Sequence, residues 1–294
     1  QVYQEEKKTK HNIRALVNCL QAEVSEEAKP YIHFTTTSFD IVDTANSLRY
    51  RKAAEELVVP TIKKLEKKLL EISLKEKKTL QIGRTHGQAA VPVTVGFSLA
   101  EYVSRLGNRI KAISRSANRL KGKISGAVGA YNASHLFFDD PEEFEKDVLG
   151  KLNLKPGCHS TQIVEPEYMT DFIHTITSCF GVLANFSDDM RHLQRSEIGE
   201  VGEYFAEDQV GSSTMPHKRN PINYENVKSM WKEFMPRMVT VYQDQISEHQ
   251  RDLTNSASGR FIPEIIVGLL ASANRLIRVL DKFIVDKENL RENF

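Results

Sequence analysis

The segment 211–221, GSSTMPHKRNP, gathers side chains that could bind and deprotonate an anionic substrate. Hydroxyls, an imidazole, two cations and an amide follow one another here. Pro216 and Pro221 oppose helix formation and Gly211 allows conformations closed to other residues, so we expect a loop. Donors and cations at this density suit a carboxylate or a carbanionic intermediate. Taken alone, such a loop is more often a solvated basic turn.

Two further polar segments could contribute to the same chemistry: 37–45, TSFDIVDTA, and 83–88, GRTHGQ. Taken alone, Thr37 and Ser38 are ordinary residues to precede a helix. A lone His86 is more often structural than catalytic. An imidazole can nevertheless carry a proton near neutral pH, which makes His86 a candidate proton donor.

Long helices are predicted to position these segments. Only 15 glycines and 10 prolines are present, and apolar side chains recur at steps of three and four, a pattern typical of amphipathic helices. The predicted helices cover 99–124, 169–193 and 262–283, with 54–74 kinked at Pro60 and 223–250 bent near Pro236. The predicted loops are 33–44, 83–92, 125–141, 155–162 and 203–221, and only short pieces such as 79–82 could pair locally as strands. The sequence thus predicts an all-α bundle of long helices with its functional groups in the loops.

Composition excludes several classes of function. With 40 Lys and Arg against 39 Asp and Glu, the net charge of +1 argues against a dedicated nucleic-acid binder. No long uncharged apolar run and no signal-peptide pattern is present, so we expect neither a membrane span nor a leader. Cys19, Cys158 and Cys179 lie far apart, which favours a reducing cytoplasm. The spacing of possible ligands predicts no metal site. The first residue is Gln, so we expect a piece of a longer protein.

The three polar segments, in their order along the chain, resemble the TSxDxxDT, GRTHGQ and GSSxMPxKxN signatures of the fumarase/aspartase superfamily. The resemblance implies a long-helix bundle that assembles into a homotetramer with a helical core and active sites shared between subunits. It also implies that residues 1–36 are a remnant of the N-terminal helical domain and that 37–294 form the central long-helix domain. The small C-terminal helical domain of the superfamily is expected to be absent.

Within the superfamily, the chain most resembles the adenylosuccinate lyases. Arg251, Ser256 and Arg260 match the residues that hold the nucleotide in that branch. The resemblance implies a β-elimination that releases fumarate from adenylosuccinate, giving AMP, and from SAICAR, giving AICAR, in purine biosynthesis. The implied partner is a purine nucleotide, and the chemistry needs no cofactor.

The resemblance also assigns roles to individual residues. Ser212 is the implied base and His86 the implied acid, while Glu225 orients His86 and Lys218 holds the substrate carboxylate. A serine acts as a base only when its pKa is lowered, for which backbone donors and Lys218 are candidates. The implied substrate-binding residues are Lys10, His11, His33, Thr37, Ser38, Thr85, Gln162, Ser213, Met215, His217, Asn220, Arg251, Ser256 and Arg260, the two arginines and Ser256 serving the phosphate.

Two alternatives stay open at this point. One is a sister enzyme, a 3-carboxymuconate cycloisomerase or another fumarate-releasing lyase. The other is a noncatalytic helical protein that keeps the fold.

Overall fold

The computed structural model describes residues 1–206 and 208–294, which divide into two compact units. Unit 1 comprises Gln1–Tyr50, Arg119–Met169 and Ile246–Thr254, and unit 2 comprises Arg51–Asn118, Thr170–Gln245 and Asn255–Phe294. The predicted boundary at residue 36 concerns the domains of the superfamily and stays a prediction.

Unit 1 contains mostly short helices, and it has a small apolar core of Ile124, Leu149 and Leu154. Its elements are α1 (Val2–Thr9), α2 (Asn12–Glu23), the 3-10 turns η1 (Lys29–Tyr31) and η3 (Ser134–Leu136), α6 (Pro141–Lys151) and most of α3 (Ser38–Ala53). These short helices were not predicted, because α1 buries none of its residues and α2 only three. A helix with so few buried positions leaves little periodicity in the sequence.

The predicted loop 33–44 is wrong after residue 37, because α3 begins at Ser38. The backbone N–H of Thr37 donates to the carboxylate of Asp40, at 2.6 Å. An acidic side chain that reaches back to the residue before a helix is one half of a capping box. The TSFD sequence therefore starts the helix at the point where a loop was expected.

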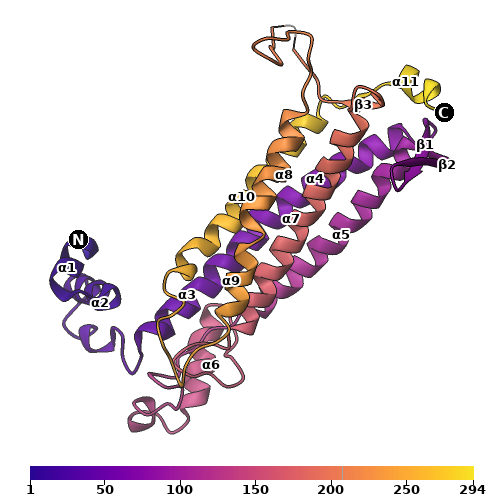
Figure 1. The fold of residues 1–294 in the computed structure, drawn as a ribbon. Helices are drawn as coiled ribbons and strands as arrows, with labels where there is room; N and C mark the ends of the chain where they lie inside the picture. Colours follow the sequence, from indigo (N-terminus) through magenta and orange to yellow (C-terminus); the bar gives the residue numbers. More distant parts are fainter. Residues whose placement is uncertain (207) are drawn as a thin grey trace. The chain divides into compact units, whose positions relative to one another are not determined.

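Unit 2 is built from long helices, as predicted (Figure 1). A π-helical turn, η2 (Ala54–Val58), leads into α4 (Val59–Lys75). The predicted kink at Pro60 takes this form because Pro60 has no N–H and its ring crowds the carbonyl four residues earlier. The other long helices are α5 (Val95–Arg119), α7 (Glu167–Leu193), α8 (Ile222–Phe234) and α10 (Ser258–Leu280), and the short α9 (Arg237–Gln243) follows α8.

Helices α5 and α7 lie side by side. Polar bonds join them along their length, from Arg105 to Asn185 at 2.7 Å and from Arg109 to Ser178 at 3.0 Å. Most of their predicted apolar positions are buried, and each fully buried Leu, Ile or Phe contributes about 1.5–3 kcal/mol. Helix α10 packs against α4 and α8, so closely that a Cβ at Gly268 would lie 2.4 Å from the ring of Phe234.

Two predicted helix ends are wrong. The helix expected over 99–124 stops at Arg119, because the carbonyls of Lys121 and Lys123 accept hydrogen bonds from hydroxyls of α3 instead. The helix expected over 223–250 is broken before Pro236 and ends at Gln243.

The described strands form two small antiparallel pairs in unit 2. One is the hairpin β1 (Leu80–Thr85) and β2 (Gln88–Thr94); the other is β3 (Val201–Gly202) with β4 (Ile284–Val285), which is followed by α11 (Lys287–Glu292). The local pairing predicted near 79–82 is confirmed, but the predicted loop 83–92 is wrong. Five successive residues of β2 are exposed, so the alternation that marks a strand is missing. Both pairs lie at the same end of the helices of unit 2 (Figure 1).

Candidate active site

The signature segment 211–221 forms a loop in unit 2, as predicted. Its neck is closed by a hydrogen bond from the Asn220 side chain to the carbonyl of Gly211, at 3.1 Å. A Cβ on Gly211 would lie 1.8 Å from the carbonyl oxygen of Lys218. Only glycine permits this approach, so Gly211 lets the two arms of the loop cross.

Ser212 lies just above this neck and is half-buried. Its Oγ accepts hydrogen bonds from the backbone N–H groups of Thr214, at 3.3 Å, and Met215, at 3.2 Å. Donors that face a hydroxyl oxygen favour its ionised form. The backbone donors expected around the predicted base are therefore present.

The other predicted residues of this loop surround Ser212 with exposed side chains. Ser213, Met215, His217 and Lys218 are exposed. Lys218 donates its backbone N–H to Met215 at 3.0 Å and so helps to shape the turn. Within the described residues, no hydrogen bond joins its ammonium group to Ser212.

Glu203 fixes the entry to the loop, and it was not among the residues predicted from the sequence. Its buried carboxylate accepts from the backbone and side-chain N–H groups of Asn223, at 2.9 and 2.6 Å, and from the N–H of Tyr224, at 3.1 Å. Pro221 precedes α8 and offers no capping side chain. Glu203 therefore satisfies the first N–H groups of α8 from the opposite end of the loop.

Gln194 braces the same neck from the end of α7. Its side-chain carbonyl accepts from the N–H of Glu203 at 3.1 Å, and its amide donates to the carbonyl of Arg219 at 3.2 Å. One side chain thus holds both arms of the loop.

His86 sits at the tip of the β1–β2 hairpin. Thr85 pairs with Gln88, and His86 and Gly87 between them have φ of 54° and 73°. Two positive φ angles define a two-residue type I′ turn. His86 and Thr85 are both exposed, so the turn presents the imidazole to its surroundings.

The hairpin is anchored by the fully buried carboxylate of Glu200. Arg84 donates to it from both terminal guanidinium nitrogens, Nη1 and Nη2, at 3.1 and 2.5 Å, and Gln81 donates at 2.8 Å. Glu200 and Glu203 stand three residues apart, beside β3. The hairpin that carries His86 and the loop that carries Ser212 are therefore fastened to the same short segment of unit 2.

The remaining predicted residues of unit 2 are separate from these two elements. Glu225 lies exposed in the first turn of α8; Ser256 precedes α10, and Arg260 lies in its first turn, both exposed. The structure of the described residues contains no hydrogen bond that links Glu225, Ser212 and His86 to one another. The predicted pairing of Glu225 with His86 stays a prediction.

Unit 1 brings together a second set of predicted residues at the start of α3. The hydroxyl of Ser38 lies 3.5 Å from Nε2 of His11, whose Nδ1 accepts from the N–H of Arg14 at 3.3 Å. Nδ1 of His33 lies 2.5 Å from the hydroxyl of Thr36. Burial lowers the pKa of His33, although nearby Asp40 opposes the shift. Lys10 is exposed at the end of α1.

Gln162 and Arg251 also lie together in unit 1. The N–H of Gln162 donates to the carbonyl of Gln250 at 3.2 Å. The guanidinium of Arg251 lies over the ring of Phe39, 4.2 Å from its centroid, in the range of a cation–π contact. Arg251 itself lies in a non-helical stretch, and its contact with Phe39 attaches this stretch to α3.

Asp43, one turn after Phe39, supports the Gln162 segment. Its carboxylate accepts from the N–H of Val164 at 2.9 Å. Burial of the carboxyl raises its pKa from 3.8 to about 6, against the bond from Val164 and the charge of Arg251, which both lower it. Apart from its place in the TSFDIVDT segment, nothing in the sequence marks Asp43 as a support.

Neither a metal centre nor a membrane-spanning helix is found in the part of the chain that the structure describes. No group of three or more His, Cys, Asp or Glu among these residues is arranged to hold a metal ion. None of their helices combines the length and apolar character needed to cross a membrane.

Sequence comparison finds similar proteins over the whole chain. The model of a family described as lyase matches residues 1–235. Adenylosuccinate lyase of Aquifex aeolicus is 34% identical over 294 residues, which are 99% of this chain and 65% of the relative. The enzyme of that name from Archaeoglobus fulgidus is 37% identical over 290 residues, 98% of this chain and 64% of the relative. The chain thus spans about 65% of the length of these curated relatives.

Solved structures agree on the fold. The 3-carboxy-cis,cis-muconate lactonizing enzyme of Pseudomonas putida matches with a TM-score of 0.87 and 26% identity, over 99% of this chain and 65% of that one. The fumarate lyase of Mesorhizobium sp. BNC1 matches with a TM-score of 0.85 and 22% identity, over 99% of this chain and 64% of that one. The second likeness concerns the fold alone.

Proposed function

The chain belongs to the lyase family, within the fumarase/aspartase superfamily, and from this premise we propose that it is the larger part of an adenylosuccinate lyase. The reaction is the β-elimination of fumarate from adenylosuccinate, giving AMP, and from SAICAR, giving AICAR. The observation that carries the proposal is the turn at Ser212, whose Oγ receives two backbone N–H groups. Relatives named adenylosuccinate lyase over nearly the whole chain support the substrate class.

The elimination needs a base on one face of the succinyl group and an acid on the other. Ser212, as an alkoxide, removes the proton from the carbon beside one carboxylate. The electron pair forms the double bond of fumarate as the C–N bond breaks, and His86 gives a proton to the departing nitrogen. The exposed tip of the hairpin and the half-buried turn of the loop present the two groups from separate elements.

The negative charge that gathers on the substrate carboxylate requires fixed donors and cations. The proposed donors to this carboxylate are Lys218, Asn220, Thr37, Ser38 and Gln162. Arg251, Ser256 and Arg260 bind the phosphate, for which a guanidinium fork is better suited than an ammonium group. The other proposed substrate contacts are Lys10, His11, His33, Thr85, Ser213, Met215 and His217.

We also propose that the sites form between copies of the chain in a homotetramer. Ser212 and His86 form no hydrogen bond within the described chain, and exposed apolar side chains such as Phe97, Phe261 and Val267 remain on the helices of unit 2. A second copy would bring a different His86 to each Ser212 and cover these faces. Light scattering tests this, because a monodisperse monomer with full activity contradicts it. The three cysteines are free, and we propose the cytoplasm as the compartment.

A sister activity is the second candidate, because the muconate lactonizing enzyme shares the fold at 26% identity. The purified protein should be given adenylosuccinate, SAICAR and 3-carboxymuconate in parallel, with products identified by NMR. We expect AMP or AICAR in equal amounts with fumarate, and no lactone. Arg251→Ala and Arg260→Ala should raise KM for adenylosuccinate. Full activity in both variants would remove the nucleotide assignment, and no product from any substrate would favour a noncatalytic role.

A further inference from the structure

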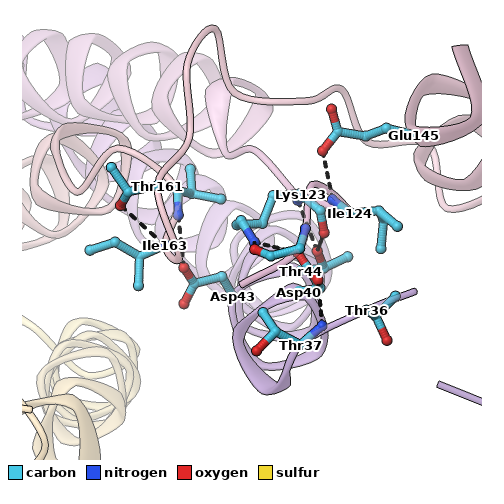
Figure 2. Close-up of polar contacts among 12 residues, drawn as sticks. Thr36, Thr37, Asp40, Asp43, Thr44, Lys123, Ile124, Glu145, Thr161 and Ile163 are labelled. Atoms are coloured by element: carbon cyan, nitrogen blue, oxygen red, sulfur yellow. Dashed lines mark hydrogen bonds and ion pairs between the residues drawn. The ribbon is translucent and has the colours of Figure 1, made fainter. Parts of the chain in front are cut away.

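Asp40 and Lys123 form an ion pair in unit 1 whose two side chains are both 0% exposed. Removing two charges from water is costly, and a buried pair often stabilises a fold no better than apolar side chains would. The pair therefore calls for an explanation other than stability. Figure 2 shows it at the centre of the polar contacts between α3 and the segments that follow α5.

The carboxylate of Asp40 binds backbone groups on two sides. One oxygen accepts from the N–H of Thr37 at 2.6 Å, and the other accepts from the N–H of Gly126 at 3.3 Å. The ammonium of Lys123 donates to the carbonyl of Gly126 at 3.1 Å. Thr44 completes the clamp, since its hydroxyl bonds both the N–H and the carbonyl of Lys123, each at 3.1 Å. The start of α3 and the turn at Gly126 are thus held by one pair of charges.

The same turn leads to the segment that carries Gln162. Gly129 has φ of 80°, and a Cβ there would lie 2.1 Å from the carbonyl oxygen of Ser160. The two segments are therefore in direct contact, and only glycine fits between them. The carboxylate of Asp43, which is labelled in Figure 2, accepts a hydrogen bond from the N–H of Val164 at 2.9 Å. Two carboxylates of α3 thereby fix both Thr37 and the Gln162 segment.

We propose that Asp40 and Lys123 are positioning residues for the subsite of Thr37, Ser38 and Gln162 that binds a substrate carboxylate. The inference rests on the proposed function, and it assigns the pair no contact with substrate. A rigid polar clamp behind the binding groups holds them in place before substrate arrives. Displacing such groups by about 1 Å can cost on the order of 100-fold in activity.

The test compares the wild type with the double variant Asp40→Leu/Lys123→Met. Replacing both charges leaves no unpaired buried charge, so we expect a folded protein, with a melting temperature lowered by the loss of the acceptor for the N–H groups of Thr37 and Gly126. Its KM for adenylosuccinate and its inhibition constant for fumarate should rise about 10- to 100-fold. The Kd for AMP, which lacks the succinyl carboxylates, should stay unchanged. Glu143→Gln/Lys146→Gln, which removes an exposed pair on α6, should change none of these values.

A wild-type KM in the folded double variant would overturn the inference. If that variant does not fold, Asp40→Asn takes its place, because it keeps the shape of the side chain while weakening the pair, and the same KM outcome applies. Hydrogen–deuterium exchange of the wild type gives a further test. The amides of Thr37 and Gly126 should exchange slowly, and fast exchange of both would also overturn the clamp. A wild type that is inactive on adenylosuccinate but has slow amides would refute the proposed function alone.

Discussion

The carboxylate of Glu203 caps helix α8 by accepting the backbone N–H of Tyr224, at 3.1 Å, across the whole signature loop. Because Pro221 cannot cap the helix itself, this contact and those to Asn223 fix the point at which the chain returns to the bundle. The loop that carries Ser212 is therefore tied at both ends while its tip stays exposed. Such a loop can present a reactive group without losing its position.

We expect Glu203→Ala to lower the free energy of unfolding by about 1–3 kcal/mol, because it leaves buried N–H groups without acceptors. The freed neck should also lower kcat by roughly tenfold or more. Urea denaturation and the rate of fumarate release measure the two effects. Glu197→Ala, at an exposed position of the same segment, is the matched control. Equal stability and activity in the two variants would contradict the role of Glu203.

A second prediction concerns the stability of the turn at His86. Gly87 has φ of 73°, and a Cβ added there would have no atom within 4 Å, so Gly87→Ala meets strain without a clash. The left-handed conformation should cost about 1–2 kcal/mol. The misplaced imidazole should lower kcat. Gly150→Ala, which adds a methyl in open space at the end of α6, should be neutral or stabilise by up to about 1 kcal/mol. Thermal unfolding measures the melting temperatures of both variants. Equal melting temperatures would refute the strained turn at Gly87.

The long helices of unit 2 could be predicted because each buries a continuous apolar stripe. Leu99, Leu106 and Ile113 of α5 are buried at the predicted spacing, as are Phe172 and Ile176 of α7. The positions of helix ends could not be predicted in the same way, since long-range contacts set them. Residues 120–124 continue the apolar pattern of α5, yet hydroxyls of α3 take the carbonyls of Lys121 and Lys123.

In the candidate site, too, some features could be predicted from the sequence and others could not. The motif residues Ser212 and His86 were predicted from their segments, and the structure gives them a turn and a hairpin tip. The buried carboxylates that support them, Glu200 and Glu203, were missed. The partners of the Glu200 carboxylate lie about ninety residues or more away along the chain, and those of Glu203 lie about twenty residues away. A single acidic residue in a polar segment gives no sign of which distant N–H groups it will meet.

The raised pKa of the Asp43 carboxyl predicts that the stability of the protein depends on pH. Its pKa is about 6 in the folded protein against an ordinary value of 3.8, so the folded state binds more protons between these values. Its contribution to the free energy of unfolding is full below about pH 4 and is lost as pH rises through about 6. The whole loss corresponds to about 3 kcal/mol.

Asp43→Asn cannot titrate and keeps an oxygen for the N–H of Val164. Relative to the wild type, this variant should therefore become more stable as pH rises from 4 to 7, by up to about 3 kcal/mol. Urea denaturation at several pH values measures the difference. Asp147→Asn, at an exposed position of α6, serves as the control. A difference between Asp43→Asn and the wild type that does not change with pH would contradict a raised pKa.

Ser212 is the proposed base of a fumarate-releasing elimination, and kcat of Ser212→Ala on adenylosuccinate tests this role most directly. The variant should fold and bind AMP as the wild type does, since the side chain lies in a half-buried turn. Its kcat should fall by about 10²- to 10⁴-fold, the usual contribution of a general base, whereas Ser229→Ala on the exposed surface of α8 should leave kcat unchanged. A Ser212→Ala protein that releases fumarate at the wild-type rate would contradict the proposed mechanism.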